Sequence, residues 1–152
     1  MRRRRTLLIV AAVVVLFLVL SAMLARVYSS VSAERSGVTA LIDAQAHGNQ
    51  AAMIADLYQC RSSAACRARV AQSATNLRYP GSVSILELTV SSSFPLGGDV
   101  GVARVAWEPQ GHLPITQCVR VRHAGNPLTG LKVELLEISR RIKTNADCPK
   151  QF

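Results

Sequence analysis

The side chains that could do chemistry in this chain are few and widely spaced. Its four cysteines are Cys60, Cys66, Cys118 and Cys148, and its three histidines are His47, His112 and His123. Metal sites built from cysteine and histidine need short paired spacings such as Cys-x-x-Cys, and the sequence contains none. We therefore expect no metal site, and we interpret the histidines as solvated residues of loops or helix ends.

The even number of cysteines indicates two disulfides, for which four cysteines allow three connectivities. Cys60 and Cys66 are close enough in sequence to meet across a short stretch of helix or a tight loop. We favour a local Cys60–Cys66 bond and a Cys118–Cys148 bond that ties a strand to the C-terminal tail. Disulfides persist in oxidising compartments, so this interpretation favours a domain outside the cytoplasm.

Three acidic residues are candidates for general acid–base work. Asp43 follows the apolar pair Leu41-Ile42, Asp56 precedes Leu57, and Glu134 interrupts an apolar strand. No two of these acids have a spacing that argues for acid–base chemistry. We interpret each one as a solvated or ion-paired surface residue, and we predict no catalytic residue, no cofactor and no enzymatic activity.

The arginines of the predicted strands allow two interpretations. They are Arg104, Arg120 and Arg122. They can form a basic pocket for an anionic ligand or for phosphate headgroups, or an outward face paired with the acids Glu87, Glu134 and Glu137. We favour the paired face, because opposite charges on neighbouring strands are ordinary in antiparallel sheets. Trp107, at a strand end, is similarly expected to be a core or rim aromatic, with the anchoring of a protein partner as the alternative.

The formal charge of +9 is largely local to the N-terminus. Five of the 18 basic residues lie at or before Arg26, whereas all 9 acids lie beyond it, so the remainder carries about +4. A nucleic-acid binder would show a basic stripe with interleaved aromatic residues. Beyond Arg26 aromatic residues are few and basic residues are spread out. We expect no nucleic-acid partner.

The elements that must position these residues begin with one apolar run, Leu7 to Ala25. It holds 19 residues without a charge, and Arg26 closes it. At ~1.5 Å rise per residue, such a helix spans about 28 Å, close to the ~30 Å hydrocarbon core of a bilayer. We predict a transmembrane helix at 7–25 rather than the buried helix of a soluble domain.

Four arginines set the predicted orientation of this helix: Arg2, Arg3, Arg4 and Arg5. The positive-inside rule keeps such a cluster cytoplasmic, so the C-terminal part of this single-pass protein of the cell membrane lies outside the cytoplasm. A cleaved signal peptide is the alternative. Its apolar region is usually ~7–15 residues long and ends at a small-x-small site, for which Ser30-Val31-Ser32 is a poor match. We favour an uncleaved anchor.

Beyond the anchor, the sequence predicts helices first and strands second. A polar, serine-rich stalk at 26–37, which can continue the anchor helix, is followed by helices at 38–49, 50–57 and 65–77. Gly48 suits the left-handed end of one helix, and Asn49 suits the N-cap of the next. Alternating apolar residues then predict strands at 83–90, 100–107, 115–123 and 131–142.

Two of these strands carry further predictions. In the third strand, Val119 and Val121 share a face with His123, whereas Cys118 and the two arginines share the other face. In the fourth strand, the apolar residues change parity at Leu135-Leu136, which indicates a bulge or bend.

The resulting fold class is α+β, with helices packed on one face of a bent four-stranded antiparallel sheet. The predicted parts are a cytoplasmic basic tail at 1–6, the transmembrane helix at 7–25, the stalk at 26–37, an extracytoplasmic domain at 38–142, and a tail at 143–152 tethered by Cys148.

Residues 32–142 resemble the cystatin-like cone of the nuclear-transport-factor-2-like superfamily. The resemblance is carried by the helix Val38 to Ala46, the phrase Ala44 to Gln50 around the Gly48-Asn49 step, and the strands that follow, of which the last is bent. The chain is also similar to small bacterial single-pass proteins that place such a domain outside the membrane. The resemblance implies a long first helix packed into a bent sheet. It leaves activity open, since the superfamily includes isomerases, dehydratases, polyketide cyclases, ligand binders and interaction domains.

Our leading hypothesis is a membrane-anchored, non-catalytic binding or interaction domain of the bacterial envelope, with an envelope protein as its partner. The alternatives are a cone that binds a small apolar or anionic molecule, and an isomerase- or cyclase-like enzyme with Asp43 or Asp56 directed into a cavity.

Overall fold

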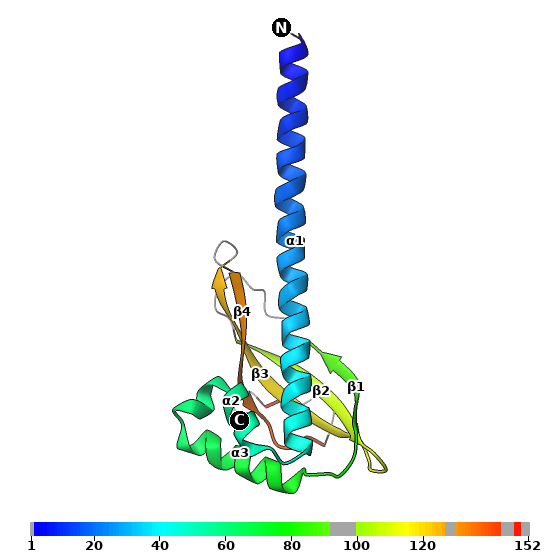
Figure 1. Ribbon diagram of the computed structural model, residues 1–152, viewed down its shortest axis with the longest axis vertical. Helices are drawn as coiled ribbons and strands as arrows, with labels where there is room; N and C mark the ends of the chain where they lie inside the picture. Colours follow the sequence, from blue (N-terminus) through cyan, green and yellow to red (C-terminus); the bar gives the residue numbers. More distant parts are fainter. Residues whose placement is uncertain (1, 92–99, 127–129, 144–147, 150–152) are drawn as a thin grey trace.

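The computed structural model describes residues 2–91, 100–126, 130–143 and 148–149 of the chain. A very long helix packs against a four-stranded antiparallel sheet, and two shorter helices lie at one end of it (Figure 1). The helices are α1 (Arg2–Ala46), α2 (Gln50–Asp56) and α3 (Ala64–Asn76), with the 3₁₀ turn η1 (Tyr58–Arg61) between the last two. The strands are β1 (Val83–Thr89), β2 (Val100–Pro109), β3 (Ile115–Asn126) and β4 (Gly130–Ile138). This arrangement confirms the α+β prediction.

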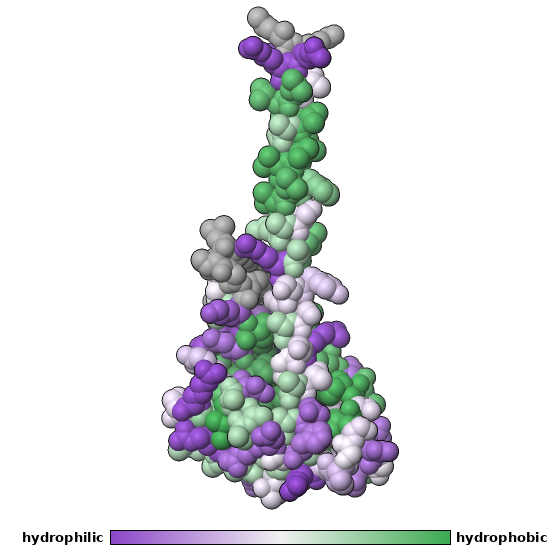
Figure 2. All heavy atoms as spheres, in the orientation of Figure 1, coloured by the Kyte–Doolittle hydropathy of each residue, from purple (hydrophilic) through white to green (hydrophobic). Residues whose placement is uncertain are grey.

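The N-terminal half of α1 stands free of the folded domain. The helix is long and apolar enough to cross a membrane, and no part of its apolar window is buried by protein. Figure 2 shows this segment as an apolar column with hydrophilic residues at its N-terminal end. Soluble proteins do not leave so much continuous apolar surface in water, so this column fits the predicted anchor at 7–25.

The predicted stalk at 26–37 continues the anchor helix, as the sequence allowed, but it is also part of the folded domain. It is a continuous part of α1, because the stretch lacks proline and its single glycine, Gly37, stays helical. Side chains within it are already part of the folded domain, since Ser30 is 5% exposed and Glu34 is 1% exposed. The anchor therefore enters the domain core without a flexible linker.

The C-terminal end of α1 and the start of α2 follow the predicted pattern. Gly48 has a left-handed backbone with φ of 70°, which only glycine adopts readily. The side-chain oxygen of Asn49 accepts a hydrogen bond from Ala52 N at 3.1 Å, so Asn49 is the N-cap of α2. The reversal brings α2 and α3 back toward the sheet.

The sheet is a meander with strand order β1-β2-β3-β4. In the β3–β4 pairing, Arg120 lies opposite Glu137 and Val121 lies opposite Leu135, so Leu136 is an extra residue. This confirms the bulge predicted at Leu135-Leu136. A second bulge, at Leu86 in β1, was not predicted. Bulges bend a strand and increase its twist, and the sheet curves around the C-terminal half of α1 (Figure 1).

The core lies between α1 and the concave side of this sheet. Val38, Leu41 and Ile42 of α1 are completely buried. They belong to one apolar cluster with residues of the central strands, which include Ala103, Val105, Trp107, Val119 and Val121. The predicted face assignment of β3 is correct, because Val119, Val121 and His123 are buried while Arg120 and Arg122 are partly exposed.

Both predicted disulfides are present. Cys60 of η1 is bonded to Cys66 of α3, and Cys118 of β3 is bonded to Cys148 of the tail. The fourth strand is shorter than predicted, since β4 ends at Ile138 and Ile142 forms an isolated bridge with Thr116. Cys148 is thus tied to the sheet at Cys118.

Candidate functional site

Of the three acid–base candidates of the sequence, Asp56 and Glu134 line one open hollow, and Asp43 does not. The side chain of Asp43 is 63% exposed and lies 3.4 Å from the Nδ1 atom of His47. Asp56 is exposed at the end of α2, and Glu134 is engaged by Arg122. The enzyme hypothesis required Asp43 or Asp56 to point into a cavity. Asp56 lines an open hollow, in which the other acid, Glu134, is paired with Arg122, whereas Asp43 is largely exposed.

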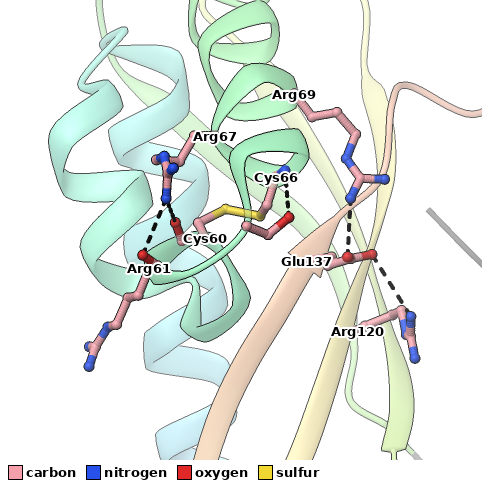
Figure 3. Close-up of a disulfide and its surroundings, with 8 residues drawn as sticks. Cys60, Arg61, Cys66, Arg67, Arg69, Arg120 and Glu137 are labelled. Atoms are coloured by element: carbon pink, nitrogen blue, oxygen red, sulfur yellow. Dashed lines mark hydrogen bonds and ion pairs between the residues drawn. A yellow bond between two sulfur atoms is a disulfide. The ribbon is translucent and has the colours of Figure 1, made fainter.

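Two of the three strand arginines are paired with acids, as predicted. Glu137 accepts a hydrogen bond from Arg69 of α3 at 3.1 Å, and its other oxygen lies 3.8 Å from Nη1 of Arg120 (Figure 3). Glu137 is only 13% exposed, so this pairing holds α3 against the edge of the sheet beside the Cys60–Cys66 bond. Among the described residues, the Nε atom of Arg104 has no hydrogen-bond partner, so the prediction of a fully paired face fails there.

Arg122 joins the sheet to η1. Its Nε donates to Glu134 Oε2 at 2.8 Å, and its guanidinium carbon lies 5.0 Å from the centre of the Tyr58 ring. The hydrogen bond to Glu134 raises the pKa of Arg122 above its ordinary value. The arrangement combines an ion pair with a cation–π contact, and both favour a fixed guanidinium.

Trp107 is a core residue, so its alternative role as a partner anchor is wrong. Its ring is completely buried, and its Nε1 donates to Gln117 Oε1 at 2.9 Å. Gln117 also exchanges hydrogen bonds with Gln45 of α1 and donates to the Ser139 carbonyl at 2.9 Å. This buried amide network fixes α1 against β2, β3 and the end of β4.

A second buried polar cluster was missed by the sequence analysis. Glu34 of α1 accepts hydrogen bonds from the backbone N–H and the hydroxyl of Ser91, at 2.6 and 3.0 Å. Its Oε2 atom also lies 3.2 Å from Nε2 of His123, which is 4% exposed. The prediction that His123 is solvated is therefore wrong. The helical spacing of Glu34, Val38 and Leu41 is the signal that could have placed Glu34 on the buried face.

An open hollow lies where α1, η1 and the start of β4 meet, and we call it the proximal hollow. Its volume is about 450 Å³, and it is lined by Gly37, Ala40, Asp56, Tyr58, Arg61 and residues 132–135. Its lining balances two acids, Asp56 and Glu134, against Arg61 and Lys132. It therefore has no net preference for an anion or a cation.

Two further hollows lie at the other end of the domain, and we call them the distal hollows. One, of about 230 Å³, is lined by Gln72, Ser73, Asn76, Leu77, Arg140 and Arg141. The other, of about 430 Å³, is lined by Pro114, Thr116, Arg141, Ile142 and Lys143. They share Arg141, and the sequence analysis did not single out any of their basic residues.

Within the described part of the chain, no three histidine, cysteine, aspartate or glutamate side chains gather as metal ligands would. The chain matches no protein-family model, no curated protein and no solved structure. The function proposed below is therefore based on the structure of this chain alone.

Proposed function

We propose that this protein is a single-pass membrane protein whose disulfide-bonded domain binds another protein of the bacterial envelope outside the cytoplasm. The observation that carries the proposal is α1 itself. Its N-terminal half is an exposed apolar column, and its C-terminal half is the central helix of a disulfide-bonded core. One rigid element thus joins the bilayer to the folded domain.

The orientation is part of the proposal. The arginines at 2–5 favour a cytoplasmic N-terminus, and the two disulfides favour an oxidising compartment for the domain. The two indications agree, because the first favours a cytoplasmic N-terminal end of α1 and the second favours a domain at its other end outside the cytoplasm. We also propose that the fold is a cystatin-like cone, which the long helix packed inside a bulged, curved sheet supports.

The helix also fixes where the domain presents its surfaces. Gln45 is 20 residues beyond Ala25, which at 1.5 Å per residue corresponds to about 30 Å along the helix. No flexible linker stands between these two residues. A domain at a fixed distance from the membrane is suited to binding a partner that is itself anchored in the envelope.

The test is in-cell crosslinking of the tagged full-length protein, followed by solubilisation and mass spectrometry. A chimera that joins residues 1–25 to an unrelated secreted domain is the matched control. We expect one envelope protein to be recovered in amounts comparable with the bait, and not with the chimera. Recovery of the protein alone, or of the same proteins with both baits, would contradict the proposal.

Binding of a small polar molecule is the second candidate function. The proximal hollow favours it, because about 450 Å³ is in the range of ligand sites and charged groups of both signs line it. Against this candidate, the hollow is open, and Glu134 is already held by Arg122. A ligand screen on the full-length protein follows if the crosslinking recovers no partner.

A further inference from the structure

The distal hollows differ in charge from the proximal hollow, whose lining includes Asp56 and Glu134. Three cations line them, Arg140, Arg141 and Lys143, and no described acid does. By contrast, Arg69 and Arg120 are compensated by Glu137. Arg140 donates to the neutral amide of Gln72 at 3.3 Å, which leaves its charge uncompensated. This part of the surface therefore favours an anionic group.

An exposed apolar residue is next in sequence to one that lines the larger distal hollow. Leu113 is 77% exposed, more than any other large apolar side chain described beyond α1. It directly precedes Pro114, which lines the larger distal hollow, and it follows a turn at Gly111, whose φ is 77°. An exposed leucine adjoining a hollow that two cations line offers an apolar contact near charged groups, a combination that protein interfaces use.

The position of the distal hollows excludes the headgroups of the protein's own membrane as the source of the anion. Thr116 lines the larger hollow, and its neighbour Gln117 is hydrogen-bonded to Gln45 of α1 at 2.8 Å. That level is about 30 Å along the helix from Ala25. Charges are largely screened beyond about 8 Å at physiological ionic strength, so the headgroups cannot reach these arginines.

We propose that the distal hollows bind an acidic segment of a partner protein. Its carboxylates pair with Arg141 and Lys143, and an apolar side chain of the segment packs on Leu113. Guanidinium and carboxylate groups match each other in a two-pronged hydrogen-bonded pair, which gives such a site both attraction and orientation. This inference rests on the proposed function and specifies where and how the partner binds.

The experiment places a photocrosslinking benzoylphenylalanine at Leu113 of the full-length protein in cells. It compares this bait with the same bait carrying Arg141→Glu and Lys143→Glu. The matched control carries Arg61→Glu and Lys132→Glu, which make the same change of charge in the proximal hollow. Resistance of each purified variant to thiol labelling under denaturing conditions shows that its disulfides, and thus its fold, have formed.

We expect a crosslinked peptide with at least two aspartates or glutamates. The charge reversal in the distal hollows, Arg141→Glu with Lys143→Glu, should lower the yield of this peptide about tenfold or more. The charge reversal in the proximal hollow, Arg61→Glu with Lys132→Glu, should leave the yield unchanged. A yield that survives the distal reversal, or a crosslinked peptide without acids, would overturn the inference. An adduct on a phosphate- or uronate-bearing polymer without peptide would also overturn it and would identify the anion as a wall polymer. If the tagged protein recovers a partner, and the charge reversal in the distal hollows does not lower that recovery, the proposed function stands and only this inference fails. If no partner is recovered by either route, the proposed function fails.

Discussion

Glu34 of α1 and His123 of β3 lie within 3.2 Å of each other, and both side chains are at most 5% exposed. They join α1 to the sheet only nine residues beyond the end of the apolar run at Ala25. Ser91, which follows β1, bonds to the same carboxylate. One buried carboxylate thus connects three separate parts of the chain at the end of the domain nearest the apolar run.

The first prediction concerns this carboxylate. Replacing Glu34→Ala removes the buried carboxylate that accepts from the Ser91 N–H and lies against the His123 ring. We expect a loss of about 3–5 kcal/mol in the free energy of unfolding, as for other broken buried pairs. Urea unfolding of the full-length protein in detergent, followed by the fluorescence of the single, buried Trp107, measures it.

The matched control for this prediction is Glu87→Ala. Glu87 is exposed on β1, and its removal should change the free energy of unfolding by less than about 0.5 kcal/mol. Equal, small effects of the two substitutions would show that Glu34 does not hold the helix to the sheet.

The second prediction concerns the amide network around Gln117. Gln117→Leu removes the partner of Trp107 Nε1, of the Gln45 amide and of the Ser139 carbonyl. We expect a loss of about 3 kcal/mol, because unpaired buried polar groups each cost about 1–3 kcal/mol. In a double-mutant cycle with Gln45→Leu, the two losses should fall short of additivity by about 1–2 kcal/mol. Strict additivity would show that the two amides do not act as one network.

The third prediction concerns the disulfides. Protein purified without reductant should not react with a thiol reagent in denaturant, and after reduction it should take up four labels, because no described cysteine is free. Trypsin cleaves after Arg61, which lies between Cys60 and Cys66, so a non-reduced digest should yield two peptides joined by that bond. A second joined pair should contain Cys118 and Cys148. Any joined pair that mixes the two bonds would contradict the structure.

Much of the fold was accessible from the sequence, because it depends on local patterns. The parity change at Leu135-Leu136 predicted the β4 bulge. A similar change of parity occurs in β1, where Ile85 and Leu88 both pack against the core although they are three positions apart. The sequence analysis did not use it to predict the bulge in β1. Gly48 and Asn49 predicted the turn into α2 because left-handed glycine and N-capping are local requirements.

The polar contacts were not accessible in the same way, because they join residues far apart in the chain. Glu34 and His123 are separated by 89 positions, and nothing local shows that the imidazole meets a carboxylate. A polar, serine-rich segment is typical of a stalk, yet tertiary contacts bury one face of it. The distal hollows also could not be predicted from the sequence, since they are formed where α3, the residues before β3 and those after β4 come together.

The central claim is that α1 places the domain outside the cytoplasm, and thiol labelling in intact spheroplasts tests it most directly. The probe position is Leu113→Cys, since Leu113 is 77% exposed and the native cysteines are bonded. The control position is Arg3→Cys in the N-terminal tail. With a membrane-impermeant maleimide, we predict that Cys at 113 is labelled before lysis and that Cys at 3 is labelled only after lysis. The reverse pattern, or labelling of both positions only after lysis, would contradict the account.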